Sequence, residues 1–346
     1  MSQQFHYSMT GIAKPSPEFY SVFSPTEVLE LMEALKVYRE IPLKYSYKGG
    51  GAKIWNKFYQ NHVIAKWYQK PNVEVELLQQ NFLYINGSYQ KVAKVNIVDV
   101  GAGNSYPVKG ILAQLHKLGK INQYIALDIS EELLTISQAN IKKWFPSLKI
   151  YTHRVDIEKQ TIPLTIFLDI LTTSSDDQIN DMANIFLHLG VTIGNHQNRN
   201  KALQNLKNSM NKLDLLIFTN EIGSNSTWNQ DPRGGCKYHV EGIYKWIQES
   251  LGIKPEHCQL VRKYDFETDS ITASIRFKQN YTISFSQLDM EYNVEFSENE
   301  EITIWRHHKY ELPELMQDIE EAGLQIVDYS RSGNLSHIMV ICKVAS

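Results

Sequence analysis

The sequence predicts an α/β protein in which a mainly parallel, seven-stranded sheet carries helices on both faces, together with a second, α+β domain. Between residues 95 and 219, short β-branched runs alternate with helix-like segments, a pattern typical of parallel strands. After residue 311 a helix and two strands close the chain, which adds an antiparallel pair to the sheet. Residues 224–310 contain alternating polar and apolar runs, which indicate an antiparallel insertion.

Composition and charge exclude several classes of protein. The 346 residues, of which 42% are apolar, suffice for one large core or two unequal ones, so the chain as a whole is not disordered. A net charge of -3 offers no general attraction to nucleic acid or to an anionic membrane. Three widely spaced cysteines fit a reducing compartment, and neither a signal pattern nor an apolar run of roughly 18 residues is present. We therefore expect a cytoplasmic protein that binds neither nucleic acid nor membranes. The sequence leaves its oligomeric state open.

The N-terminal segment contains one clear helix and an aromatic-rich stretch. Residues 24–27 (SPTE) combine a serine cap, a first-turn proline and a glutamate at the third position, which predicts a helix from about 25 to 38. Three glycines at 49–51 precede the aromatic residues Trp55, Phe58, Tyr59, Trp67 and Tyr68. These side chains form either the core face of a helix or the wall of a ligand site, and their spacing alone favours the core.

The remaining elements follow from the same patterns. The expected parallel strands cover residues 95–100, 124–127, 149–155, 184–189 and 213–219, and the expected helices cover 108–118, a segment from 131 onwards, and 200–211. In the insertion, 271–277 and 281–285 alternate like a hairpin with 278–280 as its turn, and 301–305 could add a strand. A helix from 312 to about 323 and strands at 324–329 and 337–344 complete the sheet.

Glycines and aspartates stand at the carboxyl ends of three strands, where open α/β sheets bind their ligands. The first strand ends in Asp99 and a loop with Gly101 and Gly103, whose small size lets a cofactor approach the backbone. Asp128 closes the second strand, where it could accept hydrogen bonds from two ribose hydroxyls. Asp156 closes the third strand, where it could accept a hydrogen bond from an adenine amino group. In the alternative interpretation, the loop is only a tight turn and the aspartates only cap helices.

The glycine spacing distinguishes two adenosine cofactors. A dinucleotide-binding loop carries a third glycine, but Tyr106 stands at that position here. An acid followed by G-x-G, a second acid at the next strand end and an antiparallel C-terminal pair are the features of folds that bind S-adenosyl-L-methionine (SAM). We therefore expect SAM as cofactor and a Rossmann-like, class I methyltransferase sheet.

One segment resembles the signature of a particular methyltransferase family. Residues 187–195 (LHLGVTIGN) resemble the F-L-G-S-T-I-G-N sequence of the histidine-specific Nα-methyltransferases, the ergothioneine-pathway family that trimethylates the amino group of histidine. Other segments match in order: Tyr47, Gly51 and Trp55 resemble Y-D-x-x-G-S-x-L-F, Trp67 and Tyr68 resemble E-Y-Y, and residues 305–310 resemble T-E-x-S-x-K-Y. The resemblance covers residue 40 to the end.

The resemblance implies two domains, each assembled from separated segments. Residues 1–89 and the insertion 224–310 would form a substrate-binding domain. Residues 90–223 and 311–346 would form the SAM-binding methyltransferase domain. The implied substrate is a small amino acid or amine.

The resemblance also implies roles for individual residues. The family's cofactor contacts fall on Gly101, Lys109, Asp128 and Asp156, which join Asp99 and Gly103 of the glycine loop, although Lys109 lies two residues later than the family spacing. Asn195 would hold the amino and carboxylate groups of the substrate, and Tyr47 and Tyr68 would bind the carboxylate or line the pocket. These three form the expected catalytic set. Trp55 would line the pocket, and a family tyrosine in the insertion corresponds to Tyr244 or Tyr238.

Two positions depart from the family pattern. Counting back from Lys309, the glutamate and serine that bind the imidazole ring of histidine fall at Trp305 and His307. A site built to read polar atoms discriminates poorly once its polar groups are replaced. We therefore expect transfer of methyl groups to the α-amino group of a substrate other than histidine, such as tryptophan or tyrosine, with Trp305 as an apolar wall.

Other interpretations stay open at this point. A different transfer or cyclisation reaction with SAM, and a noncatalytic SAM-binding protein, are both compatible with these motifs. Cys236 and His239 could form one half of a zinc site with His257 and Cys258. The second pair, however, is adjacent in sequence and lacks the gap that lets both ligands face one metal, so no metal is expected.

Overall fold

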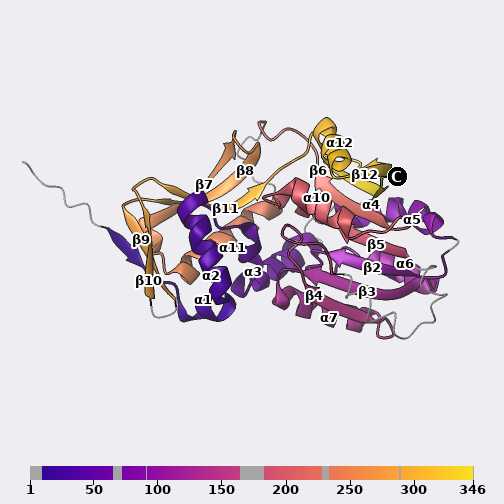
Figure 1. Ribbon diagram of the computed structural model, residues 1–346, viewed down its shortest axis with the longest axis horizontal. Helices are drawn as coiled ribbons and strands as arrows, with labels where there is room; N and C mark the ends of the chain where they lie inside the picture. Colours follow the sequence, from indigo (N-terminus) through magenta and orange to yellow (C-terminus); the bar gives the residue numbers. More distant parts are fainter. Residues whose placement is uncertain are drawn as a thin grey trace, which may run out of the picture. The chain divides into compact units, whose positions relative to one another are not determined.

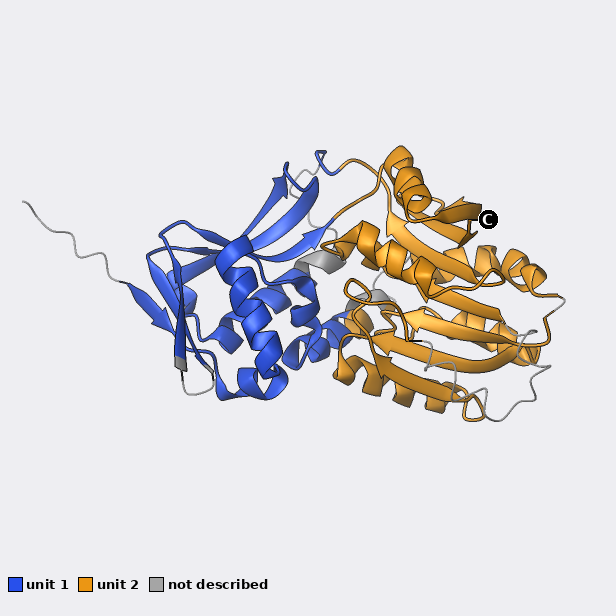
Figure 2. Cartoon of the chain, viewed as in Figure 1, with its two compact units in different colours: residues 1–58, 225–307 blue, residues 59–224, 308–346 orange. Residues whose placement is uncertain are grey.

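The computed structural model describes residues 10–64, 72–90, 92–163, 183–227, 234–287 and 290–345. The chain forms two compact units (Figure 2): unit 1 comprises residues 1–58 and 225–307, and unit 2 comprises 59–224 and 308–346. Each unit is thus assembled from two separated segments. The first boundary lies at 58 instead of 89, because Leu77, Leu78 and Ile85 are buried in a core of unit 2.

Within the described residues, unit 2 contains one seven-stranded sheet with the order β12-β13-β6-β5-β2-β3-β4 (Figure 1). Its strands are β2 (Val95–Val100), β3 (Ile121–Asp128), β4 (Ile150–Arg154), β5 (Ala183–His188), β6 (Leu215–Glu221), β12 (Leu324–Arg331) and β13 (His337–Val344). The strands from β6 to β4 are parallel, and β13 is antiparallel to both β6 and β12. The predicted parallel sheet with an antiparallel C-terminal pair is confirmed.

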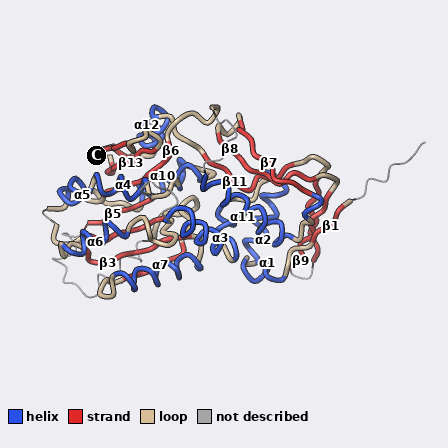
Figure 3. Tube along the Cα trace, turned by 180° about the vertical axis from the view of Figure 1, so that it is seen from behind, coloured by secondary structure: helices blue, strands red, loops and turns tan. Residues whose placement is uncertain are grey.

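Helices cover both faces of this sheet (Figure 3). One face packs against α4 (Val73–Gln80), α5 (Phe82–Ser88), α6 (Lys109–Lys117) and α7 (Glu131–Trp144), and the other packs against α10 (Arg199–Asn208) and α12 (Leu312–Glu321). The short helix α9 (Thr192–Asn195) follows β5. Because both faces are covered, β2 is buried along its whole length and its sequence VNIVDV is mostly apolar.

Local signals in the sequence set the helix starts. Ser130 caps α7 by accepting a hydrogen bond from the backbone N–H of Leu133, and two glutamates in the first turn complement the helix dipole. In unit 1, Ser24 and Glu27 form the predicted capping box at the start of α2 (Pro25–Glu33). The predicted helix to residue 38 continues beyond α2 as a π-helical turn, Ala34–Tyr38.

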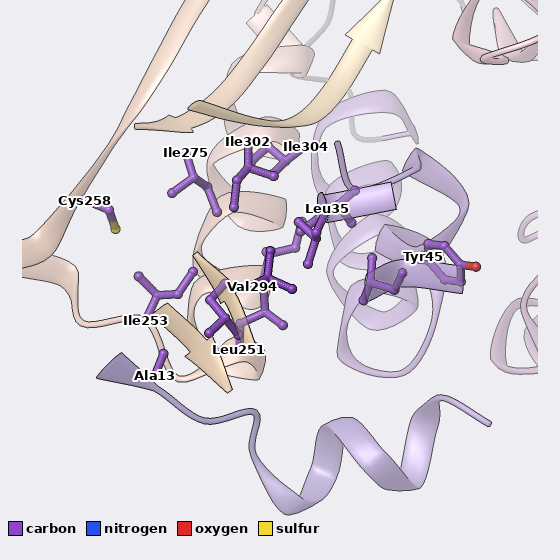
Figure 4. Close-up of a cluster of buried hydrophobic side chains, with 14 of the residues drawn as sticks. Ala13, Leu35, Tyr45, Leu251, Ile253, Cys258, Ile275, Val294, Ile302 and Ile304 are labelled. Atoms are coloured by element: carbon purple, nitrogen blue, oxygen red, sulfur yellow. The ribbon is translucent and has the colours of Figure 1, made fainter. Parts of the chain in front are cut away.

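Unit 1 is an α+β structure with two three-stranded sheets in its described residues. One sheet contains β7 (Cys258–Asp265), β8 (Ser270–Phe277) and β11 (Glu301–His307), and the other contains β1 (Gly11–Ala13), β9 (Tyr281–Gln287) and β10 (Met290–Phe296). The helices are α1 (Pro17–Val22), α2, α3 (Gly50–Phe58) and α11 (Gly234–Leu251), with short 3-10 turns at Leu43–Tyr47 and Pro255–His257. Side chains from both sheets, such as Ile275 and Val294, share one apolar core with Leu35 and Leu251 (Figure 4).

The predicted hairpin of residues 271–277 and 281–285 is wrong. The two strands are consecutive but belong to different sheets: β8 pairs with β7 and β11, whereas β9 pairs with β1 and β10. Because β8 is the central strand of its sheet, both of its edges are already paired. The strand predicted at 301–305 is confirmed as β11.

Candidate cofactor and substrate sites

The glycine loop after β2 is held against the end of the neighbouring strand. The backbone N–H groups of Gly101 and Ala102 both donate to the carbonyl of Leu127, at 2.8 and 3.0 Å. Gly101 and Gly103 have φ angles of 72° and 54°, a conformation that side chains disfavour. Gly101 is exposed, so its backbone is open to a ligand at the carboxyl edge of the sheet.

Asp128, at the end of β3, has the chemistry that a ribose requires. Its Oδ2 accepts the N–H of Gly103 and its Oδ1 accepts the N–H of Ser130, both at 3.0 Å. Each carboxylate oxygen retains a lone pair that a hydroxyl group could use. Burial raises the pKa of Asp128 to about 6. These residues fit an adenosine cofactor whose ribose lies at the end of β3.

Asp99 lies beneath the glycine loop. Its Oδ2 accepts the hydroxyl of Tyr124 at 2.5 Å, and that hydroxyl lies 2.8 Å from Oγ of Ser105, which lies 2.6 Å from Oγ of Ser137. Burial is the main cause that raises the pKa of Asp99 to about 7, and the charge of Asp128 adds to it. Asp99 is thus part of a polar network that supports the loop from below.

This raised pKa predicts a stability that depends on pH. A carboxyl group with a higher pKa in the folded chain stabilises the fold fully below its unfolded pKa, and this contribution is lost as the pH rises through about 7. Asp99→Asn mimics the protonated group. We expect the variant to be more stable than the wild type at about pH 8 by a few kcal/mol, and equally stable at about pH 4. Urea denaturation across this range tests the prediction, and parallel stability profiles would contradict it.

Asp156 and Lys109, the two other residues predicted to contact the cofactor, lie in different surroundings. Asp156 follows β4, is half-buried, and accepts the N–H of Glu158 through Oδ1 at 3.2 Å. Lys109 begins α6 and is exposed, and its Nζ lies 4.7 Å from the ring centroid of Trp144. A cation over an indole face is a stable arrangement by itself. The contact of Lys109 with a cofactor therefore stays a prediction.

Asn195 ends a tightly constrained turn. Gly190 and Val191 both have positive φ angles, of 81° and 57°, and α9 follows at once. The N–H of Gly194 donates to Oδ1 of Asn220 at 3.1 Å, and the carbonyl of Gly194 accepts the N–H of His308 at 3.0 Å. The partly exposed Asn195 is thus displayed at the carboxyl edge of the sheet by a turn that the chain holds on two sides.

The sequence patterns did not single out several residues at the carboxyl edge of the sheet. Asn220, near the end of β6, holds the Asn195 turn, and its position at a strand end could have marked it. His188, at the end of β5, bonds to the carbonyl of Val100. Tyr124 could not have been found, because its partner Asp99 comes from a neighbouring strand.

Unit 1 brings some of the predicted substrate residues together. The rings of Tyr47 and Trp55 meet edge to face, with centroids 6.5 Å apart. Tyr47 and Phe58 each lie against the ring of His239, at 5.9 and 5.2 Å. Burial lowers the pKa of His239 to about 4, so this ring is neutral at neutral pH. We call Tyr47, Trp55, Phe58 and His239 the aromatic cluster.

The other predicted substrate residues are distributed over unit 1. Trp305 and His307 both lie on β11, with ring centroids 5.9 Å apart, and are 9% and 6% exposed. The hydroxyl of Tyr244 lies 3.3 Å from Sγ of Cys258, whereas Tyr238 is 55% exposed. Tyr68 lies outside the described residues.

No group of three or more His, Cys, Asp or Glu side chains in the described residues is arranged to hold a metal ion. None of their helices is long and apolar enough to cross a membrane.

Comparison with known proteins identifies the family. A SAM-dependent methyltransferase from Clostridium acetobutylicum ATCC 824 superimposes with a TM-score of 0.46 and 13% identity, covering 84% of this chain and 99% of its own. Magnesium protoporphyrin IX methyltransferase from Synechocystis PCC 6803, with bound SAH, has a TM-score of 0.44 and 10% identity, covering 88% of this chain and 98% of its own. No curated protein matches the sequence. The family model of the SAM-dependent, histidine-specific methyltransferases matches residues 26–342, so the chain belongs to this family and is a SAM-dependent methyltransferase.

Proposed function

We propose that this methyltransferase transfers methyl groups from SAM to the α-amino group of an amino acid, or of a related small amine, other than histidine. The substrate that fits best carries an aromatic side chain, such as that of tryptophan or tyrosine. The proposal keeps the family's cofactor and amino-acid substrate class, and changes only the side chain that is recognised.

The observation that carries the proposal lies on β11. The family's imidazole-binding glutamate and serine fall at Trp305 and His307, whose rings lie against each other. Glu301 is the one carboxylate in the sequence of this strand, EITIWRH, and it pairs with Arg276 at 2.6 Å and with Lys263 at 3.0 Å. Because this carboxylate is already paired, it is a poor substitute for the missing glutamate.

The aromatic cluster supports an aromatic substrate. Its three aromatic rings and the neutral His239 supply flat, weakly polar faces, which favour contact with another ring at centroid distances of about 4.5–7 Å. Trp305 is 9% exposed and belongs to the apolar core of the same unit. A neutral imidazole carries no charge that would select an ionised side chain.

The expected chemistry is in-line displacement. SAM supplies a methyl group activated by its sulfonium. Asn195 would hold the amino and carboxylate groups of the substrate. The amine must lose its proton before it attacks. With no covalent intermediate, alignment is the main contribution of these residues, and it can supply about 7–11 kcal/mol in well-oriented systems.

Incubation with methyl-labelled SAM and a panel of amino acids and amines tests the proposal. We expect label on tryptophan or tyrosine, with a kcat/KM at least roughly tenfold above that of histidine. Mass spectrometry locates the methyl groups and distinguishes them from any larger group transferred from SAM. Phenylalanine is a matched control, because its ring lacks both the indole N–H of tryptophan and the hydroxyl of tyrosine. The methyl ester of the best substrate tests whether the free carboxylate is recognised.

Two outcomes would contradict the proposal in different ways. A preference for histidine would refute the altered side-chain specificity but leave α-amino methylation intact. Label on none of the α-amino compounds would refute the substrate class.

A further inference from the structure

A hydrogen-bonded chain crosses the carboxyl edge of the sheet in unit 2. His188, the last residue of β5, bonds through Nδ1 to the carbonyl of Val100 at 2.8 Å and through Nε2 to Nε2 of His196 at 3.0 Å. Nδ1 of His196 lies 2.9 Å from Oε1 of Glu158. We call His188, His196 and Glu158 the histidine chain. It links the ends of β2 and β5 to the loop after β4.

The two imidazole rings are coplanar and joined end to end. Their planes differ by 7°, and their centroids lie 5.2 Å apart. The 5.2 Å between the ring centroids is close to the 3.0 Å between the two Nε2 atoms plus the distance from each Nε2 to the centre of its own ring. The rings therefore meet at their edges and do not stack face to face. An N–H in the plane of one ring therefore points at the in-plane lone pair of the other, the geometry of a strong hydrogen bond.

The partners determine where the protons lie. The Val100 carbonyl only accepts, so His188 donates to it from Nδ1. Burial, followed by the charge of His196, lowers the pKa of His188 to about 3, so the neutral ring has a lone pair at Nε2. His196 must then donate from Nε2, and its Nδ1 lies against the carboxyl group of Glu158. The three hydrogen bonds thus form one chain from the Val100 carbonyl to Glu158.

The histidine chain adjoins each part of the proposed ligand site. Val100 precedes Gly101, and His196 follows Asn195. Glu158 lies two residues after Asp156, and its Oε2 also accepts the N–H of Asn198 at 3.2 Å. Among the described residues, the titratable groups bonded to His196 are Glu158, from the loop after β4, and His188, from β5.

We propose that His188, His196 and Glu158 are positioning residues that hold the glycine loop, the Asp156 loop and the Asn195 turn in one arrangement competent to bind SAM. A site ordered before binding avoids the free energy of ordering its loops when the ligand arrives. The inference depends on SAM as cofactor and not on the identity of the methyl acceptor, so it can fail or succeed independently of the proposed substrate.

Nitrogen NMR of protein labelled in its histidine side chains tests the proton positions directly. We expect a proton at Nδ1 and a lone pair at Nε2 on His188, and a proton at Nε2 on His196. His188→Phe and His196→Phe assign the signals. A proton on Nε2 of His188, or none on Nε2 of His196, would overturn the proposal.

Binding of S-adenosylhomocysteine, measured by calorimetry, tests the positioning role. We expect His188→Phe and His196→Phe each to weaken binding roughly tenfold, because a phenyl ring fills the space but makes none of the hydrogen bonds. The double variant should bind no more weakly than either single variant, because either change breaks the same chain. His116→Phe, on α6 at the surface, is the matched control and should bind as the wild type does. Additive losses, or wild-type affinity in the folded variants, would overturn the proposal.

Glu158→Gln and Glu158→Leu test the link between His196 and the loop after β4. The introduced amide can still bond to Nδ1 of His196 and accept the N–H of Asn198, whereas leucine can do neither. We expect Glu158→Leu to bind S-adenosylhomocysteine roughly tenfold more weakly than the wild type, and Glu158→Gln to bind more tightly than Glu158→Leu. Wild-type affinity in a folded Glu158→Leu protein would overturn the proposal.

Discussion

Asp128→Ala is expected to weaken the binding of S-adenosylhomocysteine at least roughly a hundredfold, because the ribose would lose two hydrogen bonds to a charged acceptor that contribute about 1.5–3 kcal/mol each. Titration calorimetry measures the loss directly. The same carboxylate also accepts the N–H groups of Gly103 and Ser130, so the variant should melt at a lower temperature than the wild type. Binding is therefore measured well below the melting temperature.

Glu131→Ala is the matched control for this prediction. Glu131 lies three residues away in the first turn of α7, and its exposed side chain has the same charge. We expect its affinity to equal that of the wild type within about twofold, since an exposed charge at this distance is screened. A folded Asp128→Ala protein with nearly normal affinity would contradict the assignment of Asp128 to the ribose.

Gly194→Ala is expected to cost about 1–3 kcal/mol of folding free energy and roughly a hundredfold in kcat. A Cβ atom on Gly194 would lie 2.3 Å from the carbonyl oxygen of His308 and 2.8 Å from Oδ1 of Asn220. Neither neighbour can yield cheaply, since one is backbone and the other bonds to the N–H of Gly194. The turn must therefore shift and displace Asn195. Urea denaturation and steady-state kinetics measure the two effects.

Gly87→Ala controls for the generic effect of the substitution. Gly87 lies in α5, and a Cβ there would meet no atom within 4 Å. We expect unchanged activity and a gain of about 0.5–1 kcal/mol from helix propensity. If Gly194→Ala behaves in the same way as this control, the turn does not hold Asn195 in the way described.

The fold of unit 2 was predictable because its signals are local. The apolar run of β2, the serine cap of α7 and the antiparallel pair at the end of the chain are each visible in a short, continuous stretch of sequence. Parallel strands connected by helices then leave few possible topologies. The antiparallel strands of unit 1 were harder, because β8 and β9 alternate in the pattern of a hairpin and yet pair with different partners.

The difference between local signals and contacts between distant segments also applies to the candidate sites. Gly101, Asp128 and Asp156 could be named from the sequence, because residues at the carboxyl ends of parallel strands necessarily lie at one edge of the sheet. His188 and His196 also lie near one strand end, but Glu158, to which His196 bonds, lies in a loop 38 residues before His196 in the chain.

The sequence by itself determined the order of the elements in unit 2, the edge of the sheet where the cofactor site is expected, and the family to which the chain belongs. Only the tertiary structure decided which strands of unit 1 pair, which part of the chain lies beneath the glycine loop, and which groups hold the Asn195 turn. Hydrophobic periodicity and turn signals act over a few residues and can be read along the chain. Hydrogen bonds between distant loops depend on positions and proton placement that exist only once the whole sheet has formed.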